Sequence, residues 1–358
     1  QIPATDGRPE LLLPDGPLPP LTLPAFLRAG LTVQYSAGES VRIEADLHKG
    51  YSGTEIINAH VNFAAGSLVA VDVRRYVIWD PSRQHAVSIG ATASTGDEMS
   101  VGILWINPLL LGLLTGAQAP TQPDGVKVER VAFQTDEERF EAVRIFEQGR
   151  DSSTRVTYDL ATGLLLSQTT SHAVGLNRVH VQRTYLSRRY LALPWAQHAP
   201  PDWVGQTRRL TYQGANQIQL AGTNLNQSVG LSITLEELRP GLLLAAFTTV
   251  ASYGAGYPDE RATWEIACAA PMLYPLWIAP AALAAMQPHQ SIDVDPVTTF
   301  RMTFMGIENG YGMIVEEGPL ERTAYYFDAR TGMFSGMRGQ RPYGDGGGRM
   351  AIETWIAG

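Results

Sequence analysis

The chain has 358 residues, of which 44% are hydrophobic and 17% are charged, a composition typical of a folded protein and not of a disordered one. The net charge of −8 provides no bulk attraction to nucleic acid or to an anionic membrane, so we predict neither as a partner. The single cysteine excludes an intrachain disulfide and a cysteine-based metal cluster.

The first 24 residues contain seven prolines, with leucines between them. Proline at this density prevents a helix and favours an extended path. We therefore predict an extended Pro-rich N-terminal arm over residues 1–25. Its candidate assembly residues are Leu11, Leu12, Leu13, Leu18, Leu21 and Leu23. The arm either packs on its own domain or docks on a neighbouring subunit, and a head-to-tail contact of that second kind would build a fibre.

Short segments that alternate apolar and polar residues follow the arm. Such a period-2 pattern is typical of half-buried antiparallel strands. In the first half the segments are 41–47, 68–78, 126–134, 140–147 and 178–186, and in the second half they are 217–220, 231–235, 242–250, 298–305, 311–317 and 323–328. Asn309-Gly310 between two of them predicts a two-residue hairpin. The pattern indicates an all-β fold, as a barrel or a sandwich.

One short helix is predicted in each half, after Trp105-Ile106-Asn107-Pro108 and after Trp277-Ile278-Ala279-Pro280. Asn107 is placed to cap the first helix, and Pro108 and Pro280 suit the first helical position. Both helices are apolar nearly all round, so each either plugs the end of a β domain or roofs a cavity for an apolar ligand. The candidate lid residues are Trp105, Ile106, Leu110, Trp277, Ile278 and Leu283.

An uncharged stretch from Ile266 to Met286 is long enough to cross a bilayer. Three prolines inside it, Pro271, Pro275 and Pro280, would break a continuous helix. We therefore predict a buried strand followed by a short helix, and no transmembrane segment.

The second half of the chain repeats the first. Leu210 follows Leu31 by 179 residues in matching Leu-Thr-x-Gln motifs, and Trp277 follows Trp105 by 172. Val126, Arg130 and Phe133 match Val297, Arg301 and Phe304, and Asp159 and Gly163 match Asp328 and Gly332. Because the matches keep their order, we predict two tandem, internally duplicated antiparallel β domains, 26–195 and 196–358, each with one short apolar helix.

The repeated Asp-x-x-Thr-Gly of the last match is either a paired chemical site or a turn copied with its domain. An Asp side chain accepts backbone N–H bonds within a turn, and Gly supplies a positive φ. The turn interpretation predicts positive φ at both Gly163 and Gly332.

Chemical motifs are weak in this sequence. It lacks a nucleophile elbow, a phosphate-binding loop and a His-Glu-x-x-His metal motif, so we predict no cofactor and no metal. Acidic residues at 136–141 and 293–321 could supply the paired carboxylates of a carbohydrate-active hydrolase. Candidate sugar-stacking aromatics are Trp79, Trp195, Trp203 and Trp355.

These patterns lead to three functional expectations. The first is a secreted structural protein that self-assembles into an extracellular filament or surface layer, with copies of itself as partners. The second is a secreted carrier for a lipid or other apolar ligand held in the β domains, and the third is the hydrolase. The start at Gln1 is typical of a mature form left after removal of a signal peptide, which predicts an extracellular location.

Overall fold

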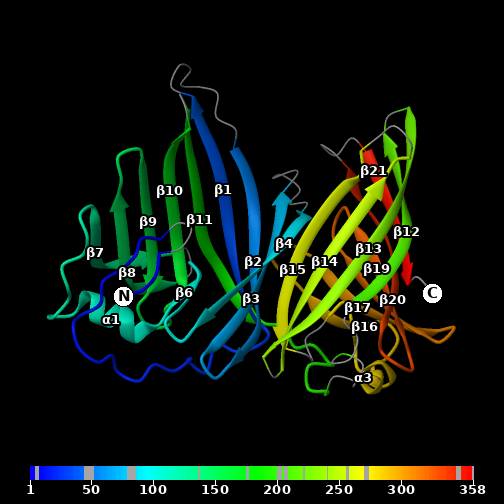
Figure 1. Cartoon of the computed structure of the whole chain (residues 1–358), viewed down its shortest axis with the longest axis horizontal. Helices are drawn as coiled ribbons and strands as arrows, with labels where there is room; N and C mark the ends of the chain where they lie inside the picture. The colour runs from blue at the N-terminus through cyan, green and yellow to red at the C-terminus, as the bar shows by residue number, and fades with distance from the viewer. Residues whose placement is uncertain are drawn as a thin grey trace. The chain divides into compact units, whose positions relative to one another are not determined.

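The computed structural model describes residues 1–4, 8–43, 52–78, 86–135, 138–174, 177–199, 204, 209–220, 222–239, 241–254, 258–269, 274–343 and 348–356. Two large antiparallel sheets dominate it, and two short helices accompany them among these residues (Figure 1). The all-β prediction is confirmed. Each large sheet is continuous, which excludes a sandwich of two separate sheets within either one.

The first large sheet has nine strands in the order β4-β3-β2-β1-β11-β10-β9-β8-β7. Its strands are β1 (Leu31–Ile43), β2 (Ser52–Ala65), β3 (Leu68–Ile78), β4 (Ala86–Asp97), β7 (Val126–Gln134), β8 (Arg139–Gln148), β9 (Ser152–Asp159), β10 (Leu165–Val174) and β11 (Asn177–Tyr190). Between β4 and β7 the chain forms the short strands β5 (Ser100–Val101) and β6 (Trp105–Ile106) and then helix α1 (Pro108–Thr115).

The second large sheet has ten strands in the order β15-β14-β13-β12-β21-β20-β19-β18-β17-β16. Its strands are β12 (Arg209–Leu220), β13 (Thr223–Arg239), β14 (Leu242–Ser252), β15 (Glu260–Ala269), β16 (Gln290–Val294), β17 (Arg301–Glu308), β18 (Tyr311–Glu317), β19 (Arg322–Asp328), β20 (Phe334–Tyr343) and β21 (Gly348–Ile356). Helix α3 (Pro280–Ala285) lies between β15 and β16.

The two sheets share one topology, which confirms the duplicated organisation. In each, four strands form a meander, a helix follows, and a second meander returns so that its last strand pairs with the first strand of the sheet. The registers also agree: Leu165 pairs with Tyr158, and Phe334 pairs with Phe327, each residue 169 positions later. Both sheets carry a register shift directly after this pair.

One sequence match is wrong. Val297 was matched to Val126, but Val126 begins β7 whereas Val297 lies in a turn before β17. Val128 pairs with Ile145, and Phe304 pairs with Ile314, which is 169 residues after Ile145. Phe304 is therefore the counterpart of Val128 and not of Phe133. The extra strand β16 precedes β17 in the second sheet and has no counterpart before β7. The added residues shift the second half relative to the first, which explains the wrong match.

The chain forms two compact units. Unit 1 comprises Gln1–Val73 and Ser94–Arg189, and unit 2 comprises Arg74–Ala93 and Tyr190–Gly358. Each has a hydrophobic core of its own. The core of unit 2 includes Trp195, which is fully buried against Tyr274 with ring centroids 5.5 Å apart. The boundaries 26–195 and 196–358 remain predictions, because compactness does not test independent folding.

Local predictions are confirmed at the turns and helix ends. Asn309 and Gly310, with φ of 52° and 83°, join β17 to β18 as a two-residue hairpin. The Asn107 side chain accepts a hydrogen bond from Leu109 N at 3.0 Å, and both helices begin with proline. The apolar stretch 266–286 contains the end of β15 and helix α3. Among the described residues, no helix has both the length and the apolar character needed to span a membrane.

Candidate functional site

The repeated Asp-x-x-Thr-Gly motif is a hairpin turn in both units. The Asp159 carboxylate accepts hydrogen bonds from the backbone N–H groups of Ala161 and Thr162, at 3.2 and 3.0 Å. Asp328 accepts from the N–H groups of Arg330 and Thr331, at 2.9 and 2.7 Å. The predicted positive φ is confirmed, at 76° for Gly163 and 73° for Gly332. Each carboxylate serves its own turn.

Each turn also holds the Trp-Ile segment of its unit. Trp105 Nε1 donates to Thr162 O at 2.8 Å, and Ile106 N donates to Gly163 O at 3.0 Å. In unit 2 the corresponding bonds run from Trp277 Nε1 to Thr331 O at 3.1 Å and from Ile278 N to Gly332 O at 3.0 Å. We call this arrangement the Trp–turn clip.

The six candidate lid residues all lie in the cores of their units. Trp105, Ile106 and Leu110 are at most 1% exposed in unit 1, as are Trp277, Ile278 and Leu283 in unit 2. The clip fixes the tryptophans and isoleucines, and the leucines anchor helices α1 and α3. This packing is what a plug requires.

The Asp328 turn predicts a pH dependence. Hydrogen bonds from the Thr331 backbone N–H, and further bonds from Arg330 N and the Thr331 hydroxyl, lower the pKa of Asp328 below its ordinary value. The hydrogen bonds to the ionised Asp328 carboxylate therefore stabilise the fold fully above about pH 4, the pKa of Asp in the unfolded chain. This stabilisation is lost as the pH falls through the pKa of Asp328 in the folded protein. We expect Asp328→Asn to cost about 1 kcal/mol at pH 7 and progressively less below pH 4, measured by urea denaturation. Asp259→Asn, at an exposed position, is the control, and a pH-independent difference would contradict this origin.

The N-terminal arm packs on unit 1. Ile2 and Leu11 are fully buried in its core and exchange backbone hydrogen bonds of 2.8 and 3.0 Å. The Gln122 side chain binds both the N–H and the carbonyl of Leu12, each at 3.0 Å. Of the other candidate assembly residues, Leu13, Leu21 and Leu23 pack partly buried against the same core, whereas Leu12 and Leu18 are 36% and 37% exposed.

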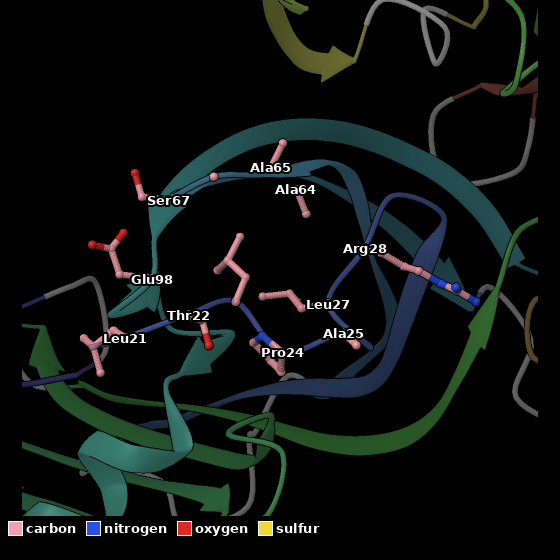
Figure 2. A pocket seen from close by; sticks show the side chains of 12 residues that line it. Leu21, Thr22, Pro24, Ala25, Leu27, Arg28, Ala64, Ala65, Ser67 and Glu98 are labelled. Carbon is pink, nitrogen blue, oxygen red and sulfur yellow. The ribbon is translucent and has the colours of Figure 1, made fainter. Parts of the chain in front are cut away.

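A groove of about 480 Å³ lies where the end of the arm meets the β2–β3 hairpin (Figure 2). We call it the arm groove. Its apolar lining is Leu21, Leu23, Pro24, Ala25, Leu27, Ala64 and Ala65, and its polar lining includes Thr22, Arg28, Ser67 and Glu98. In Figure 2, Ser67 and Glu98 lie at one end, Arg28 at the other and Leu27 between them. None of the candidate lid residues lines it.

Glu98 gives the arm groove a specific polar group. Its Oε2 atom is buried and has no hydrogen-bond partner among the described residues. A buried carboxylate oxygen without a donor costs free energy. No sequence pattern indicates this residue, because Glu98 belongs to no motif and lies near the arm only through the fold.

In unit 2, two tyrosines lie near Glu316. The Tyr325 hydroxyl is 3.5 Å from Glu316 Oε2, and the rings of Tyr274 and Tyr325 have centroids 5.7 Å apart. Burial raises the pKa of both phenols well above the ordinary value, and the Glu316 carboxylate raises it further. Both phenols therefore stay protonated near neutral pH and can donate hydrogen bonds, but they cannot act as bases there.

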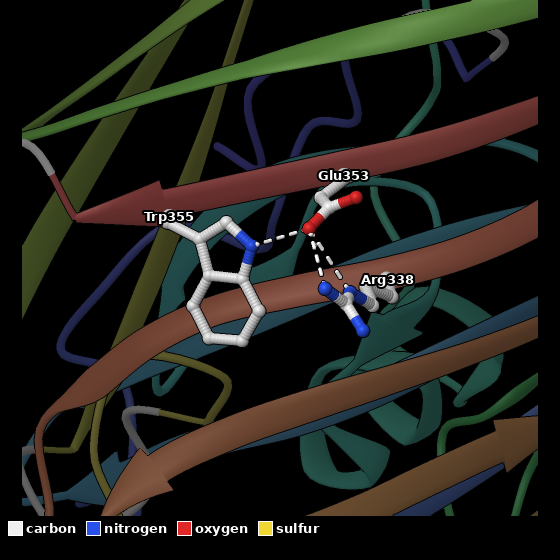
Figure 3. A network of polar contacts seen from close by, with 3 residues as sticks. All are labelled: Arg338, Glu353 and Trp355. Carbon is white, nitrogen blue, oxygen red and sulfur yellow. Dashed lines mark hydrogen bonds and ion pairs between the residues drawn. The ribbon is translucent and has the colours of Figure 1, made fainter.

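A surface network on β20 and β21 involves one of the candidate sugar-stacking aromatics. Trp355 Nε1, at 2.8 Å, and Arg338 Nη2, at 2.7 Å, both donate to Glu353 Oε1 (Figure 3). A hydrogen bond from Trp355 is the main cause that lowers the pKa of Glu353, and the hydrogen bond from Arg338 lowers it further. The Arg338 guanidinium carbon lies 5.5 Å from the Trp355 ring centroid, so this face of the indole already has a partner.

The other candidate aromatics and carboxylates are placed as follows. Trp195 is buried, and Trp79 and Trp203 lie outside the described residues, as do Asp136 and Glu137. Asp295 is 4% exposed, and its carboxylate accepts hydrogen bonds from Val297 N and Thr298 N in a turn. Within the described part of the chain, no three His, Cys, Asp or Glu side chains are grouped to hold a metal ion.

No family model matches the chain, and no curated protein matches it in sequence. Several solved structures are similar at low identity. A protein of unknown function from the DUF3598 family of Nostoc punctiforme is 10% identical, with 93% of this chain and 97% of that chain covered and a TM-score of 0.19. MucB in complex with MucA(peri) is 10% identical, with 91% and 89% covered and a TM-score of 0.19. Isotype 1 transferrin binding protein B from serogroup B Neisseria meningitidis is 7% identical, with 92% and 77% covered and the same TM-score. At these TM-scores the similarities carry no argument about function.

Proposed function

We propose that this protein binds a small apolar ligand in the arm groove of unit 1. The observation that carries the proposal is the groove itself, whose volume of about 480 Å³ lies within the range of about 300–1,000 Å³ found for small-molecule sites. Leucine, proline and alanine supply seven of its twelve lining residues, and Ser67, Glu98 and Arg28 lie at its ends. This combination is typical of sites that bind an apolar body and orient it by one or two hydrogen bonds.

The polar end at Glu98 favours a ligand that carries a hydrogen-bond donor. An amine or a hydroxyl group placed there would be attracted by the Glu98 carboxylate, whereas a ligand carboxylate would be repelled by it. We therefore propose long-chain amines and alcohols, rather than fatty acids, as the ligand class of this groove.

Titration with Nile red, a neutral apolar dye, tests the groove. Ala65 is exposed and lines the groove, so Ala65→Trp fills the groove without removing a core side chain. We expect this substitution to weaken dye binding at least about tenfold, since a tryptophan occupies space that the dye needs. Ala117→Trp, at an exposed turn of unit 1 outside the groove, is the matched control and should bind as the wild type does.

Competition against the bound dye then tests the role of Glu98. Dodecylamine and dodecanol should displace Nile red at lower concentrations than dodecanoate, and Glu98→Gln should narrow that difference. Wild-type protein that does not bind the dye, or Ala65→Trp protein that binds it unchanged, would exclude the groove as the site.

Self-assembly through the arm is a second candidate, supported by the exposure of Leu12 and Leu18 on the arm. The cis packing of Ile2 and Leu11 leaves less of the arm available to a neighbouring subunit, which is why we rank ligand binding above assembly. Secretion remains a prediction, and so does the hydrolase, for which the paired carboxylates are the sequence basis.

A further inference from the structure

Asn107 joins three segments of unit 1 through one side chain. It is 2% exposed and lies directly before helix α1. Its Nδ2 atom donates to Glu98 O at 2.8 Å and to Thr22 O at 3.3 Å. Its Oδ1 atom accepts from Leu109 N at 3.0 Å and so caps the helix. The arm, the β4–β5 turn and the start of α1 therefore meet at this residue. We call the two Nδ2 bonds the Asn107 clamp.

Both carbonyl groups in the Asn107 clamp belong to residues that line the arm groove. Thr22 lines it from the arm, and Glu98 lies at its acidic end (Figure 2). Asn107 is not among the lining residues, so it acts on the groove through these two. Hydrogen bonds that hold the residues of a site in place decide how well the site fits its ligand.

The turn that carries Glu98 is also fixed by other bonds. Asp97 Oδ1 accepts hydrogen bonds from Met99 N at 2.9 Å and from Ser100 N at 3.2 Å. The backbone N–H of Asn107 donates to Met99 O at 2.9 Å. Together with the clamp, these bonds hold the backbone on both sides of Glu98. The carboxylate is therefore carried on a turn whose position is set before a ligand binds.

Unit 2 shows that the helix does not require this asparagine. Ala279 follows Asn107 by 172 residues, the same offset as that between the two tryptophans, and it precedes helix α3. Both residues have a φ of −54° and a ψ of 126°, and Ala279 forms no side-chain cap bond. Because the same backbone geometry starts a helix with alanine, capping alone does not account for Asn107. What asparagine adds in unit 1 is the clamp.

We infer that Asn107 is the positioning residue of the arm groove, and that this position distinguishes the binding unit from its duplicate. The inference rests on the proposed function of the groove. The clamp places Glu98 at the end of the groove and holds Thr22 of the arm against the same framework. It therefore sets both the affinity for an apolar ligand and the preference for an amine over a carboxylate.

Two substitutions separate the clamp from the helix cap. Asn107→Ala removes both, whereas the hydroxyl of Asn107→Ser can still cap the helix but has one hydrogen and cannot donate to Thr22 and Glu98 together. Nile red binding should weaken about tenfold in both variants, as expected for the loss of these hydrogen bonds. Serine should recover most of the melting temperature that alanine loses. Recovery of dye binding by serine as well would show that Asn107 acts only as a cap, and the inference would be wrong.

Ligand selectivity is a readout that a loss of stability alone would not change. Both Asn107 variants should narrow the difference between dodecylamine and dodecanoate in displacing Nile red, because Glu98 is no longer held in place. Thr115→Ala is the matched control, since its hydroxyl donates to Leu111 O at 3.0 Å in α1 and does not line the groove. This control should lower the melting temperature and leave dye affinity and selectivity unchanged.

Amide hydrogen exchange of the ligand-free protein tests the clamp without any ligand. Asn107→Ser should quicken exchange at Met99 and Ser100 about tenfold and leave strand β9 as in the wild type. Asn107→Ser carries the whole test if Asn107→Ala does not fold. A wild type that does not bind Nile red would exclude the proposed function and this inference with it. A wild type that binds the dye, with Asn107→Ser equal to it in affinity and selectivity, would overturn the inference and leave the proposed function standing.

Discussion

Replacing Gly163 or Gly332 by alanine is expected to cost about 3–5 kcal/mol of stability in the affected unit. Both glycines have a positive φ, which alanine adopts only with strain. A Cβ on Gly163 would also approach the Ile106 carbonyl oxygen to 1.8 Å, and one on Gly332 would approach the Ile278 carbonyl oxygen to 2.0 Å. Because both obstacles are backbone atoms, the turn must move away from the Trp-Ile segment and break the clip.

Two other glycines separate the steric effect from the backbone strain. Gly66 in unit 1 and Gly310 in unit 2 also have positive φ, at 60° and 83°, but a Cβ on either would meet no atom within 4 Å. Gly66→Ala and Gly310→Ala should therefore cost only about 1 kcal/mol. Differential scanning calorimetry of the four variants gives the comparison. Equal losses at the clip and control positions would show that the clip contributes nothing beyond turn geometry.

One part of the Trp–turn clip could be predicted from the sequence, and another part could not. The Asp, the Thr and the Gly predicted the turn, because their roles are local and act within five residues. The contact between Trp105 and the Thr162 carbonyl joins residues 57 positions apart, and no local rule connects them. The sequence did repeat both motifs at similar offsets, so the pairing of the two repeats is the signal that could have predicted the contact.

Neither the strand order nor the register was predicted from the sequence. The nine strands that the two large sheets have in common follow the same order in both, in agreement with the repeat. The match of Phe133 to Phe304 failed because the two halves differ in length between the Trp-Ile motif and this strand, where the second sheet carries the extra strand β16. Backbone pairing assigns Phe304 to Val128.

The candidate sites depended on tertiary contacts even more. The arm groove combines arm residues with the β2–β3 hairpin and Glu98, which no spacing rule brings together. Arg8 lies in the proline-rich arm, and no sequence pattern predicts that its side chain is only 2% exposed.

Leu11→Ala is expected to destabilise unit 1 by about 2–5 kcal/mol, whereas Leu12→Ala should change its stability by less than about 0.5 kcal/mol. Leu11 is fully buried in the core, and its neighbour Leu12 is 36% exposed and is held through its backbone by Gln122. The two substitutions remove the same atoms from adjacent positions, so the difference between them measures the cis docking of the arm. Urea denaturation gives both values, and equal effects would show that the arm does not dock in this way.

The same pair of substitutions, combined with Leu18→Ala, distinguishes binding from self-assembly. An arm that docks on a neighbour would use its exposed leucines, so Leu12→Ala and Leu18→Ala together should then reduce the sedimentation coefficient of assembled protein without changing unit stability. An arm that serves only its own unit predicts unchanged sedimentation for this double variant. If the arm serves only its own unit, Leu11→Ala should also weaken Nile red binding, because Leu21 and Leu23 of the undocked arm line the arm groove. Assembly and binding thus depend on different leucines of the arm. Loss of assembly is expected from Leu12→Ala with Leu18→Ala, and loss of dye binding is expected from Leu11→Ala.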